Sequence, residues 1–417
     1  MENKAARSEN TGRLSVFAKR VARSLSRRLR DFGEVEPAGF ELENIPNADI
    51  ALYFADQPEK LYQLLQWLPV FENHTELRTI VVVRNLESYN ELRTRTSLHV
   101  LLVPNYETLM ALYDRADFHA VIYVNNGWTN FQSLSFQQAV HIHVNHGESD
   151  KICMVSNQAK AYDKVFVAGQ AAIDRHAAAI TWFDPNHLVS VGRPQLDLDI
   201  ASPLSASELE TITYAPTWEG EDEVNNYTSV DLYGPQIVAA ALAVPHARLV
   251  YKPHPRVIES ADSLVRANHK KIVDLISRAG APHAYLPNAD ILGILPDTDL
   301  LIADVSSVTL DYLYLTPHSP ILLTDRRSNP VQLLADSPMS AACAVIDQYS
   351  ISRIGELITT TLGVDTHRDD RARMRTYYFG DTAKGSSTQA FWSAITSEIA
   401  AYESALSLIQ RVRQVQS

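Results

Sequence analysis

The segment Leu300-Leu-Ile-Ala-Asp-Val-Ser-Ser-Val-Thr-Leu-Asp-Tyr312 combines a buried strand, a short turn and the start of a helix. Its opening run is apolar throughout, as in strands that are covered on both faces. Ser306 and Ser307 stand where the helix would begin, and free N–H groups at a helix N-terminus attract phosphate. Asp311 follows one turn later on the same face, within reach of a ribose hydroxyl. An ordinary serine N-cap would leave the same pattern.

The same alternation of apolar runs and helical patterns extends along both halves of the chain. It predicts βαβ units and largely parallel sheets. We expect strands at Ile50–Phe54, Ile80–Val83, Val100–Val103, Ala120–Val124, Val140–Val144, Val165–Ala168, Thr211–Ala215, Arg248–Tyr251, Asp299–Ile302 and Pro320–Leu323. Helices are expected at Pro58–Leu68, Tyr106–Tyr113, Gly234–Ala243, Lys271–Arg278, Val308–Tyr314 and Gln389–Val415.

Two α/β domains that face each other across a cleft are the simplest architecture for this pattern. The segment Asp197–Ser207, rich in Asp, Ser and Pro, is the expected linker. We therefore expect four parts: a basic amphipathic N-terminal arm, an N-terminal Rossmann-like domain, a C-terminal Rossmann-like domain and a C-terminal helix. Their predicted bounds are 1–33, 34–200, 201–385 and 386–417.

Composition favours a soluble, cytoplasmic protein. The 417 residues are 46% hydrophobic and 21% charged, which is typical of globular domains. No run of about 18 apolar residues predicts a membrane-spanning helix. The two cysteines, Cys153 and Cys343, predict no disulfide framework, and no cluster of Cys and His has zinc spacing. We expect no metal and no cofactor.

Charge divides unevenly along the chain. Residues 1–30 contain nine Lys or Arg and two Glu, which gives this segment a net charge of +7. Since the whole chain has a net charge of −12, residues 31–417 carry −19. Apolar residues from Leu14 to Leu29 recur at helical spacing within this arm. Such a helix can lie on an anionic membrane surface, which predicts a peripheral location on the inner face of the membrane. A basic tail without this role is the alternative. We expect no nucleic-acid partner, because the body is acidic.

Two further segments carry candidate catalytic residues. In the first half, His141-Ile-His-Val-Asn-His-Gly-Glu-Ser-Asp-Lys151 reads as a strand that ends before His146 and Gly147. Ligands bind at the carboxyl ends of strands in open α/β sheets, and a histidine there can act as a base near neutral pH. Lys151 could meet an anion. A hydrogen-bonded histidine that closes the strand is the alternative, and we interpret His141 and His143 as structural.

In the second half, Lys252-Pro253-His254-Pro255-Arg256 follows an apolar strand directly. The two prolines fix the backbone around His254. Lys, His and Arg at this spacing predict a phosphate site, whereas a plain charged turn is the alternative. Ala215-Pro216-Thr217-Trp218 ends another strand with a rigid turn and a hydroxyl.

Taken in order, these segments resemble the CDP-glycerol glycerophosphotransferase family, which includes teichoic acid primases and polymerases. The resemblance covers about residues 120–385. Its motifs are His146-Gly147 with Lys151, Gly192-Arg193-Pro194-Gln195-Leu196-Asp197, Ala215–Trp218, Lys252–Pro255 and Asp304-Val-Ser306-Ser307 with Asp311. It implies a fold of the GT-B type with two Rossmann-like domains, in which residues 34–200 form the acceptor domain and residues 201–385 form the nucleotide-donor domain.

The resemblance implies transfer of glycerol phosphate, or a related polyol phosphate, from a CDP-linked donor to a lipid-linked or glycan acceptor, with release of CMP. This reaction would serve the synthesis of teichoic acid or a capsule-type polymer. His146 and His254 would be the catalytic histidines. Donor-binding residues would be Gly147, Pro216, Thr217, Lys252, Pro253, Ser306, Ser307 and Asp311, with Lys151, Arg193 and Arg256 as further anion contacts.

This sequence departs from the family pattern at three places. Gln195 replaces an arginine, with Arg193 as a possible substitute, and Glu148-Ser149-Asp150 replaces Thr-Pro-Leu. Ala303-Asp304-Val305 replaces Thr-Asp-Tyr. Changes beside His146 affect the acceptor side, so the acceptor is the least defined substrate. A GT-B glycosyltransferase or epimerase with a UDP-sugar, and a non-catalytic membrane scaffold, are the alternatives.

Overall fold

The computed structural model describes residues 45–381 and 383–416 and contains two parallel β-sheets. The first has the order β3-β2-β1-β4-β5-β6-β7, and all its pairings are parallel. Its strands are β1 (Ile50–Phe54), β2 (Thr79–Val83), β3 (His99–Leu102), β4 (Ala120–Tyr123), β5 (Val140–His143), β6 (Lys164–Val167) and β7 (Leu188–Ser190). The basic arm, predicted at 1–33, lies outside the described residues.

The second sheet has the order β10-β9-β8-β11-β12-β13, again with parallel pairings. Its strands are β8 (Glu210–Ala215), β9 (Ala247–Tyr251), β10 (Ala284–Tyr285), β11 (Leu300–Asp304), β12 (Ile321–Thr324) and β13 (Ala344–Ile346). In both sheets the strand order reverses beside the first strand, at β1 and β4 and at β8 and β11. Ligands bind at such switch points in doubly wound folds.

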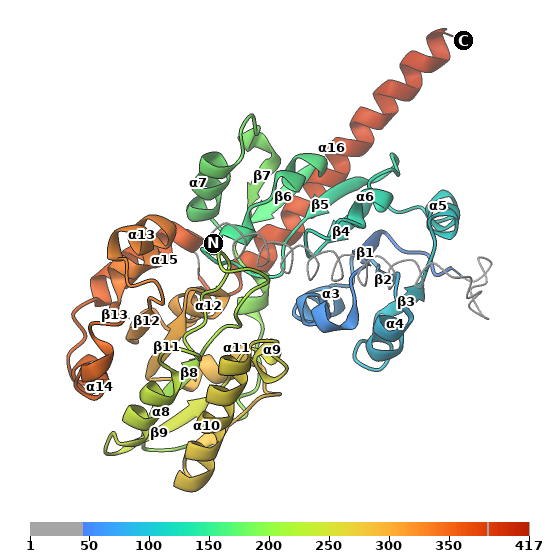
Figure 1. Ribbon diagram of the computed structural model, residues 1–417. Coiled ribbons are helices and arrows are strands. Elements are labelled where there is room, and N and C mark those ends of the chain that lie inside the picture. The colour runs from blue at the N-terminus through green and yellow to red at the C-terminus, as the bar shows by residue number, and fades with distance from the viewer. Residues whose placement is uncertain (1–44, 382, 417) are drawn as a thin grey trace, which may run out of the picture.

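Helices cover both faces of each sheet (Figure 1). Successive side chains of β1 point to opposite faces of the sheet and enter two different cores. Ile50 and Leu52 pack into one core, and Ala51 and Tyr53 pack into the other. The helices of the first domain are α2 (Tyr62–Leu65), α3 (Leu68–Glu72), α4 (Leu86–Leu92), α5 (Tyr106–Arg115), α6 (Asn130–Ser133) and α7 (Gln170–Ala179). Those that follow are α8 (Gly234–Leu242), α9 (Pro255–Ile258), α10 (Ser263–Ala279), α11 (Ile291–Ile294), α12 (Ser307–Leu315), α13 (Pro330–Asp336), α14 (Ile354–Gly363), α15 (Arg368–Phe379) and α16 (Ser386–Gln416).

The last helix, α16, returns from the second domain to the first. Phe391 and Ile395 are fully buried in a core of the first domain. Farther along the helix, Glu398 pairs with Lys164 of β6 at 3.4 Å. Figure 1 shows the end of α16 projecting beyond the body. The helix therefore joins the two domains.

Asp197, from the predicted Gly-x-Pro-x-x-Asp motif, fixes the start of α16. Its carboxylate accepts hydrogen bonds from the backbone N–H groups of Gly385 and Thr388 at 2.7 and 2.6 Å. The Tyr314 hydroxyl of α12 donates to it at 3.3 Å. This motif thus has a structural task in the described chain, where it ties the linker to two helices.

The predicted helix Pro58–Leu68 is wrong as a single element. The chain forms a 3-10 turn at Pro58–Lys60, then α2, then α3. Pro69 is the second residue of α3, and a proline there clashes with the carbonyl four residues earlier, so the helix restarts. The strands β7, β10 and β13 were not predicted. They have two or three residues each and lie at or near the sheet edges, where no long apolar run marks them.

Candidate active site

The two predicted histidines approach each other from facing domains. His146 follows β5 and His254 follows β9, and both rings contact the ring of Tyr62 edge-on. The centroid of the Tyr62 ring lies 6.0 Å from that of His146 and 5.4 Å from that of His254. Tyr62 begins α2 of the first domain, and sequence reasoning missed it, because a tyrosine in a helical pattern looks like an ordinary core residue. The Tyr62 ring thus contacts both imidazoles where the two domains meet.

Both imidazoles are neutral at pH 7. Burial of the ring, with Arg193 and Lys151 nearby, lowers the pKa of His146 to about 4. Burial and then Lys151, Lys252 and Arg256 lower the pKa of His254 well below its usual value. A neutral imidazole can accept a proton, which a base requires.

Hydrogen bonds distinguish the two histidines. Nδ1 of His254 accepts the backbone N–H of Arg256 at 3.2 Å, at the N-cap of α9. In a neutral ring the other nitrogen, Nε2, then carries the hydrogen and is a donor. Nδ1 of His146 is buried and has no hydrogen-bond partner among the described residues. His254 is therefore arranged to donate to an anion, whereas His146 keeps a nitrogen free to accept a proton.

Cationic groups surround the histidines. The Lys151 Nζ donates to Thr217 Oγ1 of the second domain at 2.8 Å. The Lys252 Nζ donates to the carbonyls of Pro253 and Pro287, both at 3.2 Å. Burial lowers the pKa of both lysines. Buried cations that are held mainly by neutral oxygens provide a site for an anion.

Turns at the ends of β8 and β9 position these groups. The backbone N–H of His254 donates to the Pro216 carbonyl at 3.0 Å. Asp304, fully buried at the end of β11, accepts the N–H of Thr217 at 2.7 Å. The Arg256 guanidinium stacks on Trp218, 3.5 Å from the ring centroid. Trp218 thus holds Arg256 at the border of the site, a role that the sequence did not predict for this tryptophan.

The N-terminus of α12 has no side-chain cap. Ser306 is its N-cap residue, but its side chain makes no capping hydrogen bond, and its buried Oγ has no partner among the described residues. The ordinary serine cap considered from the sequence is therefore not what the structure shows. A free hydroxyl beside free helical N–H groups is suited to a phosphate oxygen.

Gly147 allows a close approach between the domains. A Cβ on this residue would lie 3.1 Å from Nη1 of Arg193 and 3.3 Å from Cβ of Ser307. We expected this glycine to let a substrate approach, and the structure shows protein groups there. Arg193 in turn pairs with Asp311 of α12, with 2.7 Å between Nε and Oδ1. The Asp311 carboxylate is thus paired with an arginine, and its binding to the ribose of the donor stays a prediction.

The residues that replace Thr-Pro-Leu form a buried network. Arg175 of α7 donates to Glu148 at 2.6 Å and to Asp150 at 2.9 Å. Asp150 also accepts from Ser337 at 2.8 Å and from the Tyr378 hydroxyl, both in the second part of the chain. The loop that carries His146 and Lys151 is therefore tied to both domains. Arg175 and Tyr378 had no sequence signal, because their partners are distant along the chain.

The described part of the chain lacks a metal cluster and a membrane-spanning helix. No group of three or more His, Cys, Asp or Glu side chains there could hold a metal ion. No helix there combines the length and the apolar character that crossing a membrane requires.

Two Rossmann-like domains, with two histidines and two buried lysines where they meet, have the fold of the GT-B type. The chain belongs to the CDP-glycerol:poly(glycerophosphate) glycerophosphotransferase family, whose model matches residues 49–323. The resemblance predicted from the motifs is confirmed. The protein is accordingly a transferase that takes glycerol phosphate from CDP-glycerol.

Solved structures confirm the fold. The wall teichoic acid polymerase TagF has a TM-score of 0.56 and 14% identity, covering 87% of this chain and 91% of that chain. A TagF variant soaked with CDPG has a TM-score of 0.53 and 14% identity, covering 94% and 98%. The UDP-GlcNAc 2-epimerase from Neisseria meningitidis, bound to UDP-GlcNAc, has a TM-score of 0.53 and 12% identity, covering 84% and 99%. No curated protein matches the sequence.

Proposed function

We propose that this glycerophosphotransferase uses His146 as the base and the second domain as the donor site. His146 takes the proton of an acceptor hydroxyl, and the acceptor oxygen forms a bond to the phosphorus that bears glycerol. The bond from that phosphorus to the oxygen of CMP breaks, and CMP leaves. The carrying observation is that His146 and His254 meet at Tyr62 from facing domains, both neutral, beside buried lysines.

The donor diphosphate would bind between the N-terminus of α12 and the Lys252–His254 turn. Ser306 Oγ is buried without a partner, and His254 is arranged to donate from Nε2. Lys151 and Lys252 would balance the negative charge. Groups already aimed at the place where charge develops supply much of the stabilisation in phosphoryl transfer. Thr217, Ser307 and Arg256 border the same space and complete the proposed donor site.

The acceptor is proposed to be a lipid-linked or glycan hydroxyl at the inner face of the membrane. Support comes from the +7 charge of residues 1–30 and from the fold shared with a wall teichoic acid polymerase. Each basic residue near an anionic leaflet contributes about 1 kcal/mol. Binding to vesicles of phosphatidylglycerol, compared with vesicles of phosphatidylcholine, tests this for the full chain and for a variant lacking residues 1–33. Equal binding by both proteins would contradict it.

Release of CMP tests the reaction itself. The full chain is incubated with CDP-glycerol and a panel of acceptors that end in glycerol phosphate, ribitol phosphate or an amino sugar. We expect CMP only when a suitable acceptor is present. CDP-ribitol and UDP-GlcNAc serve as donor controls. Turnover of the UDP-sugar without turnover of CDP-glycerol would overturn the proposal.

A further inference from the structure

The proposed base lacks the polar partner that commonly orients a catalytic histidine. In many such sites a carboxylate or a carbonyl accepts the hydrogen of one ring nitrogen and thereby fixes the imidazole. Nδ1 of His146 is buried and has no hydrogen-bond partner in the described part of the chain. Besides burial, the groups that lower its pKa are Arg193, Lys151 and Lys60, which are all cations. Because these cations offer no acceptor for a ring hydrogen, another kind of contact must orient the His146 ring.

Tyr62 provides such a contact. Its ring meets the His146 ring edge-on, with an interplanar angle of 87° and 6.0 Å between the centroids. Edge-to-face pairs are favourable when their centroids are about 4.5–7 Å apart. The Tyr62 hydroxyl accepts only a long hydrogen bond from the neighbouring Gln63, at 3.4 Å. The contact with the base is therefore made by the aromatic ring and does not involve the hydroxyl.

The segment that carries Tyr62 also bonds to the backbone beside the base. Trp67, the N-cap residue of α3, donates from Nε1 to the carbonyl of Asn145 at 2.6 Å. Asn145 directly precedes His146, and its Oδ1 accepts the N–H of His146 at 2.8 Å. Residues 62–72, the segment that forms α2 and α3, thus contact both the side chain of the base and the backbone that carries it.

This segment is itself fixed by the first domain. Leu61 and Leu64, on either side of Tyr62, are buried in its core at 1% and 0% exposure. The side chain of Gln63 accepts a hydrogen bond from Nδ2 of Asn125 at 2.9 Å. The Tyr62 ring therefore extends from a rigid support, which a residue that positions another side chain requires.

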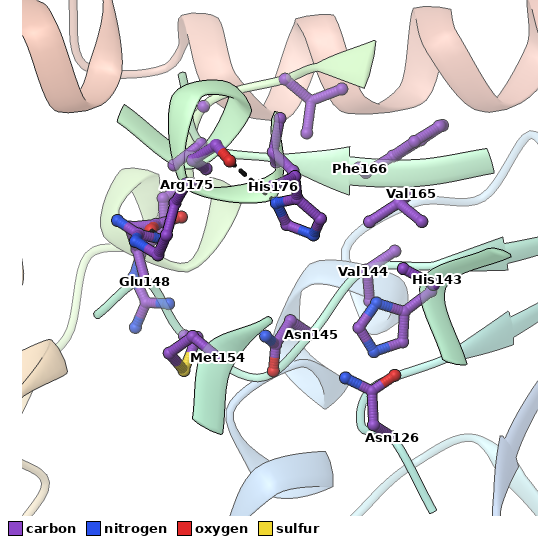
Figure 2. A pocket seen from close by; sticks show the side chains of 18 of the residues that line it. Asn126, His143, Val144, Asn145, Glu148, Met154, Val165, Phe166, Arg175 and His176 are labelled. Atoms are coloured by element: carbon purple, nitrogen blue, oxygen red, sulfur yellow. Dashed lines mark hydrogen bonds and ion pairs between the residues drawn. The ribbon is translucent and has the colours of Figure 1, made fainter. Parts of the chain in front are cut away.

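The loop of His146 is less closely packed than this support. Figure 2 shows Asn145 and Glu148 of the loop beside a pocket of about 40 Å³. Atoms that line a void lack contacts on one side. Ion pairs with Arg175 hold the loop after His146. Up to His146, the contacts with residues 62–72 supply the support.

His254 depends less on Tyr62 than His146 does. Its ring also contacts Tyr62, but it lies 6.2 Å from the Trp218 ring as well. In addition, its Nδ1 accepts the backbone N–H of Arg256 at 3.2 Å. Two contacts would therefore still hold His254 without Tyr62. Loss of the Tyr62 ring should affect activation of the acceptor more than binding of the donor.

We propose that Tyr62 is a positioning residue, whose aromatic ring sets the orientation in which His146 takes the proton of the acceptor hydroxyl. Phenylalanine can fulfil this role, because it keeps the ring, whereas leucine cannot. The inference rests on the proposed function, since it takes His146 as the base. A small displacement of a catalytic group can lower turnover by up to about 100-fold, so the effect is measurable.

Single variants test whether the ring matters. Tyr62→Leu should lower kcat for CMP release about 10-fold or more, with less than about a 2-fold change in the KM for CDP-glycerol. Tyr62→Phe should recover at least about half of the wild-type kcat. The matched control is Tyr106→Leu, because Tyr106 begins α5 as Tyr62 begins α2 but is exposed, and this variant should keep the wild-type kcat. Melting curves check folding. Wild-type kcat in Tyr62→Leu, or equal losses in the Leu and Phe variants, would overturn the role.

Double variants test whether Tyr62 acts through the base. Added to His146→Ala, the Tyr62→Leu change should cost less than about 2-fold in kcat, because the group that it orients is already gone. Added to His254→Ala, it should still cost about 10-fold. Equal losses in the two backgrounds would overturn the positioning role and leave His146 as the base. Wild-type turnover in His146→Ala alone would instead overturn the proposed reaction, and the role of Tyr62 with it.

Discussion

Arg193 and Asp311 form a buried ion pair that joins the two domains, with 2.7 Å between Nε and Oδ1. Nη2 of the arginine also donates to Oδ2 at 3.1 Å. Both side chains are almost completely buried, at 4% and 2% exposure. Burial raises the pKa of Asp311 to about 6, against the opposing effect of Arg193. The carboxylate predicted to bind a ribose is thus already engaged across the domain interface.

Asp311→Asn should destabilise the protein by about 3–5 kcal/mol, because it leaves a buried guanidinium without its counter-charge. Urea unfolding measures this loss. The double variant Arg193→Met with Asp311→Leu should recover most of it, since it removes both charges together. A loss below about 1 kcal/mol, combined with a large rise in the KM for CDP-glycerol, would instead show that Asp311 acts on the donor.

How far the sequence predicts this fold depends on the length of each element. The strands β1 and β4 are apolar runs, which the sequence alone is enough to predict. The edge strand β10 has two residues, and only its pairing with β9 makes it a strand. The register of a short edge strand depends on its neighbour, which the local sequence does not contain.

The residues of the candidate site also differ in how far the sequence predicts them. His146, His254 and Ser306 could be proposed from the sequence because each follows a strand at the edge where ligands bind. Tyr62 could not be found, because its contacts with the two histidines arise only when the domains face each other. The partner of Asp311 was missed for the same reason. Motifs locate side chains along the chain, whereas pairings across a cleft depend on tertiary structure.

His146→Ala should lower CMP release by two or more orders of magnitude, because a general base contributes about that factor. His254→Ala should also reduce turnover, by weakening stabilisation of the diphosphate. His99→Ala, at an exposed position of β3, is the control and should keep wild-type turnover. Steady-state rates, with melting curves for each variant, provide the measurement. Wild-type turnover in His146→Ala would remove the base assignment.

The pH profiles of kcat and of kcat/KM should differ on their acid side. A base must be deprotonated, so kcat/KM should fall only as pH approaches the pKa of free His146, about 4. The anionic donor favours the imidazolium form and raises this pKa in the complex. The acid limb of kcat should therefore lie at higher pH than that of kcat/KM. Steady-state rates measured across this pH range test the prediction. If the acid limbs of kcat and kcat/KM coincide, the donor does not bind beside His146.

Turnover should persist after metal removal. The proposed charge stabilisation comes from Lys151, Lys252 and the N-terminus of α12. We therefore expect unchanged CMP release in excess EDTA, after dialysis against chelator. Loss of activity that returns with Mg²⁺ or Mn²⁺ would contradict this expectation and assign part of the charge stabilisation to a cation.

Acid should unfold the protein partly through His146. Its pKa is about 4 in the folded chain and near 6.5 in the unfolded chain, so the unfolded state binds more protons between these values. Stability should therefore decrease as pH falls from about 6.5 to 4, by up to about 3 kcal/mol from this residue. Urea unfolding across this pH range measures the slope, and His146→Ala should reduce it by up to one proton. An identical slope in wild type and variant would show that His146 titrates normally in the folded protein.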